Sequence, residues 1–173
     1  MVNQTPWVER KFNFDFPLGL YPVILERLWG TIPRIVEIVR GKNDSELSNK
    51  PPGKWSAKEL IGHLYELDGL WDQRITDFLA GQETLSAADM SNQKTHQAGY
   101  NERTVAELLT LFTGRRFRLL ERVKDLTEEQ AGLVALHPRL QKPMRLVDSL
   151  YFAAEHDDHE LTKMNTLLGR LRL

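Results

Sequence analysis

Apolar residues recur with the 3.6-residue period of an α-helix in four long segments of this chain, separated by stretches rich in Pro, Gly and Asn. No stretch alternates apolar and polar residues in a way that predicts a substantial sheet. The pattern predicts main helices at about 20–40, 56–81, 101–124 and 144–171. Such helices bury their apolar faces against one another, so we predict an all-α fold, a four-helix bundle forming a single domain over residues 1–173.

Local signals place several ends of these segments. Ser56 followed by Glu59 forms a capping-box pattern at the start of the second helix. Gly41 and Gly81 predict where the first and second helices end. Thr127 predicts a short extra turn of helix after the third.

The connection between the second and third helices, residues 82–100, is too long for a tight hairpin, since bundle helices are usually joined by about 2–8 residues. At about 3.3 Å per residue it reaches roughly 60 Å, whereas the second helix is about 39 Å long. The connection can therefore run back along the bundle. We predict a crossover that starts the third helix parallel to the second.

Composition narrows the classes of function open to the chain. Because there is no cysteine, any bound metal must have nitrogen and oxygen ligands. Lys and Arg number 23 against 24 Asp and Glu, a balance that provides no basic surface for nucleic acid. The charged N-terminal segment does not resemble a secretory signal, and no apolar stretch is long enough to span a membrane. We expect a cytoplasmic protein without nucleic-acid or membrane partners.

Two histidines and one glutamate are the main candidates for chemistry. At about 100° per residue, His63 borders the apolar stripe of the second predicted helix and His156 borders that of the fourth. Relative to His156, Glu160 is turned inward by about 40° and His159 is turned toward water by about 60°. Helical bundles bind metals with imidazoles and carboxylates that project into one space. We predict a metal site of His63, His156 and Glu160.

Other interpretations of the histidines stay open. A histidine that borders an apolar face can be a hydrogen-bonded core residue, which would leave a bundle without a metal. His96 and His137 lie in predicted loops, where we expect exposed polar side chains, although either can line the mouth of the site.

Three charged residues fall on apolar faces of the predicted helices. Asp68 and Asp157 lie near the middle of their apolar arcs, and Arg116 lies on the apolar stripe of the third helix. A buried charge needs a partner. We predict that Asp157 is buried and shares a polar network with Arg116 or Asp68, and that this network serves packing rather than catalysis.

Three segments resemble the DinB/YfiT-like superfamily. KWSAKELIGHLYELDGLWDQRITDFLAG, with a tryptophan just before a helix and a histidine two turns in, is similar to the first metal-ligand helix of that family. The segment LVDSLYFAAEHDDHELTKMNTLL is similar to the last helix of the family. The early segment ERLWGTIPRI also resembles the family. The resemblance implies a four-helix bundle with a long crossover, commonly a dimer, that binds a divalent metal such as nickel or zinc through three histidines.

Carried over to this chain, the first ligand of the family falls on His63 and the first histidine of its HxxxH motif on His156. The second histidine of that motif is replaced by Glu160. A site of two histidines and one carboxylate suits nickel or zinc, with iron or manganese as further options, unless the site has lost affinity. His159 can replace Glu160 only if the last helix rotates or distorts.

The resemblance also implies a class of activity, because relatives include S-transferases and isomerases that use bacillithiol or mycothiol. We expect a divalent-metal-dependent enzyme acting on small molecules, a low-molecular-weight thiol S-transferase or a hydrolase, in detoxification or stress response and working as a homodimer. Tyr65, Glu155 and His159 are near the site in sequence, but none has a position that requires a general-base role. The alternative is a non-catalytic bundle that binds a ligand or forms a dimer, with a degenerate metal site.

Overall fold

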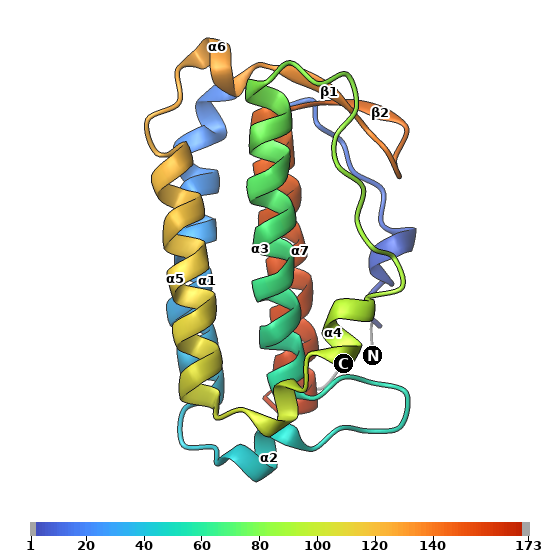
Figure 1. Cartoon of the computed structure of the whole chain (residues 1–173), viewed down its shortest axis with the longest axis vertical. Helices are drawn as coiled ribbons and strands as arrows, with labels where there is room; N and C mark the ends of the chain where they lie inside the picture. Colours follow the sequence, from blue (N-terminus) through green and yellow to red (C-terminus); the bar gives the residue numbers. More distant parts are fainter. Residues whose placement is uncertain (1–2, 171–173) are drawn as a thin grey trace.

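The computed structural model describes residues 3–170 and contains four long helices that pack side by side as a bundle (Figure 1). They are α1 (Tyr21–Val39), α3 (Ala57–Leu79), α5 (Val105–Val123) and α7 (Leu146–Leu167). The prediction of an all-α four-helix bundle is confirmed. The fourth helix ends earlier than predicted, followed by Gly169 at a φ of 73°, and predicted residue 171 lies outside the described residues.

The ends of the helices follow local side-chain chemistry. Ser56 and Glu59 form the predicted capping box at the start of α3. Thr104 and Glu107 form another, which starts α5 later than the periodicity predicts. Gly81 follows α3 with a φ of 69°, the left-handed conformation that a glycine adopts most readily.

The direction of the helices confirms the crossover. In Figure 1, α1 and α7 descend whereas α3 and α5 both ascend, so the second and third long helices are parallel. The connecting segment runs down beside α3 and includes the short helix α4 (Gln93–Gln97). Further short elements are α2 (Asp44–Ser48), α6 (Glu128–Ala131) and 3₁₀ turns at Trp7–Glu9, Leu18–Leu20 and Tyr100–Glu102.

A small hairpin that the periodicity did not predict lies at the end of the bundle where α7 begins (Figure 1). Strands β1 (Val134–His137) and β2 (Lys142–Arg145) pair antiparallel, with Val134 opposite Arg145. The crossover joins this hairpin, because the backbone N–H of Leu85 donates to the carbonyl of Leu136 at 3.0 Å. The hairpin and the start of the crossover therefore form one connected cap.

The core of the bundle contains two apolar clusters with an ionic layer between them. The layer comprises Thr31, Asp68, Arg116 and Asp157, one residue from each long helix. Arg116 Nη2 lies 2.7 Å from Asp68 Oδ1, and its Nη1 lies 2.6 Å from Asp157 Oδ2. Thr31 donates to Asp157 at 2.7 Å. The prediction of a buried Asp157 in a network with Arg116 and Asp68 is confirmed.

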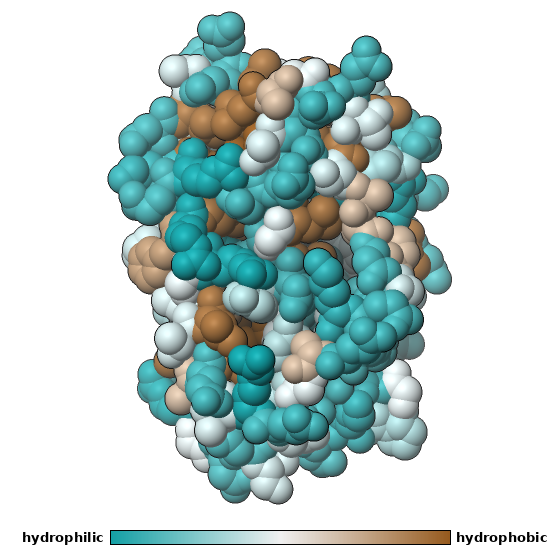
Figure 2. All heavy atoms as spheres, viewed as in Figure 1, coloured by the Kyte–Doolittle hydropathy of each residue, from teal (hydrophilic) through white to brown (hydrophobic). Residues whose placement is uncertain are grey.

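The face of the molecule in Figure 2 is mostly hydrophilic, and apolar atoms show there only in separate small areas. Within residues 3–170, no helix is both long enough and apolar enough to cross a membrane.

Candidate metal centre

Helix α3 holds His63 two turns after its capping box, at the edge of the apolar face. The side chain is 6% exposed. Its Nδ1 lies 3.4 Å from the Thr95 hydroxyl on α4, and the Trp55 ring packs against it with centroids 4.6 Å apart. The crossover and the residue before α3 therefore orient this imidazole, which leaves the other ring nitrogen for a partner elsewhere.

Helix α7 holds the other two groups one turn apart. His156 and Glu160 are 5% and 1% exposed, and His156 Nε2 lies 3.5 Å from Glu160 Oε1. The Trp7 and His156 rings pack nearly perpendicular to each other at a centroid distance of 4.8 Å. The N-terminal segment thus covers this part of α7.

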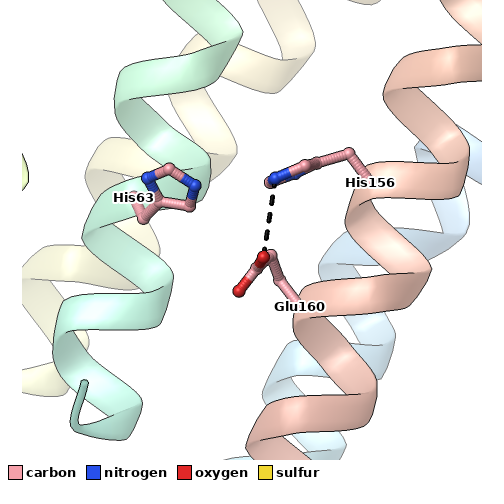
Figure 3. A group of neighbouring side chains, drawn as sticks. All are labelled: His63, His156 and Glu160. Atoms are coloured by element: carbon pink, nitrogen blue, oxygen red, sulfur yellow. Dashed lines mark ion pairs between the residues drawn. The ribbon is translucent and has the colours of Figure 1, made fainter. Parts of the chain in front are cut away.

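The structure brings His63, His156 and Glu160 together across α3 and α7, and Figure 3 shows the three side chains directed into one space. One potential ligand atom from each lies within 4.8 Å of the others, and the two imidazole centroids are 5.3 Å apart. We call these three residues the metal-site triad.

Burial sets the protonation of the triad. It lowers the pKa of His63 to about 3, with a further contribution from the positive charge of Lys163. Burial also lowers the pKa of His156, and the neighbouring His63 and Lys163 add to the effect. Both imidazoles are therefore neutral at neutral pH, which is the form that binds a metal. Burial raises the pKa of Glu160, an effect opposed by Lys163 Nζ at 2.9 Å.

Two buried atoms of the triad have no hydrogen-bond partner among the described residues, namely His156 Nδ1 and Glu160 Oε2. Buried polar atoms are nearly always paired, so such atoms point to a missing group. Ligands of a tetrahedral ion at about 2.1 Å lie about 3.4 Å apart, so small side-chain shifts would bring the triad into contact with one ion. Two neutral imidazoles and a carboxylate fit a divalent metal.

A cleft of about 500 Å³ is lined in part by the three residues of the triad. Its walls combine aromatic residues with a few polar groups, and crossover residues 87–90 form one side. This volume is in the range of small-molecule sites. The other polar side chains in the cleft are Arg74, Asp89, Asn92, His137, Arg139 and Lys163.

Two expectations for the histidines are wrong. His159 is only 4% exposed, because Gln4 Nε2 reaches its Nδ1 at 3.0 Å and Trp7 packs on its ring. His137 is also buried, at the end of β1, where Arg74 Nη1 lies 3.1 Å from its Nε2. It lines the cleft, the option that the sequence had left open. His96 is exposed, as predicted.

Of the residues considered as bases, Glu155 pairs with Arg10 and Arg27, and the Tyr65 hydroxyl accepts from Arg115. Neither lines the cleft. Sequence reasoning missed Trp7 and Lys163 beside the triad. Lys163 follows Glu160 by one helical turn, a spacing that could have indicated it. Trp7 lies outside every periodic segment, so no signal of that kind marks it.

Comparisons with known proteins agree with this architecture. The sequence profile of the DinB superfamily matches residues 25–162. The fold is similar to that of YfiT from Bacillus subtilis, described as a probable metal-dependent hydrolase with an unusual four-helix bundle topology. The TM-score is 0.76 and the sequence identity is 17%, and the match covers 94% of this chain and 93% of YfiT. A mycothiol-dependent maleylpyruvate isomerase matches with a TM-score of 0.66 and 15% identity, over 90% of this chain and 62% of the isomerase. No curated protein matches the sequence at a significant level.

Proposed function

The chain belongs to the DinB superfamily, and from that premise we propose that it is a divalent-metal-dependent enzyme acting on small molecules, as a hydrolase or a thiol S-transferase. The observation that carries the proposal is the metal-site triad at the base of the cleft, with two neutral imidazoles, one carboxylate and two buried polar atoms that lack a partner. The two structural neighbours, a probable metal-dependent hydrolase and a mycothiol-dependent isomerase, support the same class.

In this proposal His63, His156 and Glu160 bind nickel or zinc, with iron or manganese as the further options. A metal bound there would supply the acidity that converts water or a thiol into a nucleophile near neutral pH. Thr95 holds the ring orientation of His63, and Lys163 holds one oxygen of Glu160 so that Oε2 stays available. Trp7 and Trp55 shield the two imidazoles from water. We also propose that the protein is a cytoplasmic homodimer that acts in detoxification or stress response.

The competing function is a non-catalytic bundle in which the three side chains satisfy one another. It would leave Glu160 Oε2, in the space between the three side chains, buried without a partner at a cost of about 1–3 kcal/mol. This observation favours a bound ion over mutual pairing.

Calorimetry on the full chain, purified without an affinity tag and stripped with a chelator, tests the metal site. We expect one Zn²⁺ or Ni²⁺ per chain, loss of that binding in His63→Ala, and normal binding in His96→Ala, a control at an exposed histidine. At a metal concentration 100 times Kd, binding should stabilise the fold by about 2.7 kcal/mol.

The reaction class can be tested with the same samples. Hydrolysis of 4-nitrophenyl esters reports hydrolase activity, and conjugation of 1-chloro-2,4-dinitrobenzene with a low-molecular-weight thiol reports transferase activity. We expect one of these rates to disappear with the metal and to return when the metal is restored. Absence of metal binding, with stability unchanged by chelator, would support the non-catalytic bundle instead.

A further inference from the structure

Two arginines that line the cleft form no ion pair within residues 3–170, and Asp89, which lines the same cleft, accepts from the backbone N–H groups of Ser91 and Gln93 instead. Arg74, on α3, is 1% exposed, and its hydrogen bonds go to neutral groups, the carbonyl of Ser86 at 2.9 Å and the ring of His137. Arg139, in the hairpin loop, has a buried Nη2 without a partner. Within residues 3–170, no carboxylate lies within 4.0 Å of either guanidinium. We call these two residues the arginine pair.

Arg116, the other buried arginine among the described residues, provides a comparison inside the same molecule. Arg116 is fully buried and is neutralised by two carboxylates, Asp68 and Asp157. An isolated buried charge is costly, and proteins normally pair it in this way. The nearest acid to Arg74 along α3 is Asp77, but its carboxylate accepts from the Gln73 amide and the Ser86 backbone N–H. The arginine pair therefore differs from Arg116 in lacking its anion.

Both guanidiniums remain charged at neutral pH. Burial lowers the pKa of Arg74 to about 10, and repulsion from Arg139 adds to this effect, whereas the nearby negative charge of Asp77 opposes it. His137 is neutral beside the arginines, since burial and the two positive charges lower its pKa to about 3. The positive charge of the pair thus remains available to an anion that enters the cleft.

An aromatic wall connects the pair to the triad. Arg74 Cζ lies 5.1 Å from the Trp71 ring, and Arg139 Cζ lies 5.8 Å from the Phe152 ring. Phe152 is one helical turn from His156, and Trp7 contacts both of their rings. A planar or apolar molecule can lie on this wall with one end at the arginines and the other at the triad.

We propose that the arginine pair binds the carboxylate of an organic substrate whose apolar body lies on the Trp71 and Phe152 wall and whose reactive end reaches the metal-site triad. The inference rests on the proposed function for the role of the triad, whereas anion binding by the pair stands independently. A guanidinium presents paired N–H donors in one plane, which match the two oxygens of a carboxylate. The cleft volume suits a body of one aromatic ring or a comparable aliphatic chain.

The test compares benzoate with its uncharged analogue benzamide, and with phenyl phosphate, by calorimetry on the full chain after chelation. We expect benzoate to bind at least about tenfold more tightly than benzamide, because only the carboxylate makes charge-assisted hydrogen bonds to the pair. Phenyl phosphate should bind more weakly than benzoate. Equal binding of benzoate and benzamide by the wild-type protein, or a preference for phenyl phosphate, would refute the proposed carboxylate site.

Arg139→Gln provides the matching protein change, because this partly exposed loop residue can be replaced with less risk to folding than Arg74. We expect benzoate to bind about tenfold more weakly in Arg139→Gln, with partial recovery in Arg139→Lys. Arg118→Gln, at an exposed position outside the cleft, is the control and should bind benzoate normally. An unchanged affinity in Arg139→Gln contradicts the proposal.

The two proposals can fail separately. Benzoate binding in chelated protein that does not take up metal would refute the metal-dependent function but support the carboxylate site. Metal binding without a preference for benzoate would refute the carboxylate site alone.

Discussion

At the scale of single residues, burial decides the chemical state of the groups in the cleft. It lowers the pKa of His63 and of His137 to about 3, and that of His159 to about 4. Each of these side chains is therefore neutral in the folded protein down to acidic pH. In the unfolded chain the same imidazoles titrate near their ordinary value of about 6.5.

His137 yields a prediction for the pH dependence of folding. Its folded pKa lies below its unfolded pKa, so between about pH 6.5 and 3 the unfolded state binds the extra proton, and the unfolding free energy falls as pH falls. His137→Gln should reduce this loss by on the order of 0.5–1 kcal/mol per pH unit between pH 6 and 5, after allowance for partial solvent screening. Urea unfolding at pH 7, 6 and 5 measures the difference. His96→Gln is the exposed control, and equal slopes in wild type and His137→Gln would refute the prediction.

The residue scale also shows where sequence reasoning reached its limit. A helical projection placed His63, His156 and Glu160 at the edge of apolar faces, and these side chains do meet. The same projection turned His159 toward water, because it describes one helix and cannot include a covering segment. Gln4 and Trp7 supply that cover from more than 150 residues away in sequence. His137 was misjudged for a similar reason, since its burial depends on the hairpin packing against α3 and α7.

At the scale of elements, the ionic layer joins all four long helices. Arg116 on α5 contacts Asp68 on α3, Asp157 on α7 and the carbonyl of Leu28 on α1. Asp157→Ala should destabilise the fold by about 3–5 kcal/mol, because it leaves part of a buried charge uncompensated. Urea unfolding measures this change. Glu121→Ala, at an exposed ion pair on α5, is the control and should change stability by less than about 1 kcal/mol.

A second element-level prediction concerns the contact of the crossover with α3. A Cβ added at Gly62 would lie 2.2 Å from Cδ2 of the buried Tyr100 ring, so the ring and the end of the crossover would have to move. Gly62→Ala should destabilise the fold by about 1–3 kcal/mol through overpacking. This loss outweighs the gain of about 1 kcal/mol that alanine brings over glycine in helix propensity.

Gly30→Ala on α1 is the matched control for this position. A Cβ at Gly30 meets nothing within 4 Å, so the substitution should stabilise the fold by up to about 1 kcal/mol. Thermal or urea unfolding of both variants measures the pair. A stabilising Gly62→Ala would show that Tyr100 does not pack against α3 as described.

The long helices could be predicted from sequence because their periodicity and caps agree, as Ser56 with Glu59 shows for α3. The hairpin could not be, because each strand has four residues, too few for a recognisable alternation. Its pairing with the crossover through Leu136 depends on segments about fifty residues apart. Short-range patterns carry no information on such a contact.

At the scale of the whole molecule, the topology builds the cleft. The crossover was predictable from its reach, since nineteen residues can span the length of a helix. It returns beside α3, so its residues form one wall of the cleft, while the hairpin and the N-terminal segment supply other parts of the lining. Helices α3 and α7 provide the triad, and three segments outside the four long helices enclose it. The periodic pattern could locate the triad but not its enclosure.

We propose that His63, His156 and Glu160, and not His159, bind a metal. The test is the amount of metal bound per chain in wild type, Glu160→Ala and His159→Ala. Each protein is dialysed against Zn²⁺ and then against buffer, and its metal is measured by elemental analysis. We expect about one metal per chain in wild type and in His159→Ala, because Gln4 contacts the His159 ring outside the triad. We expect a large loss of metal in Glu160→Ala, because this carboxylate lies close to both imidazoles. Loss of metal in His159→Ala together with full occupancy in Glu160→Ala would contradict the proposal.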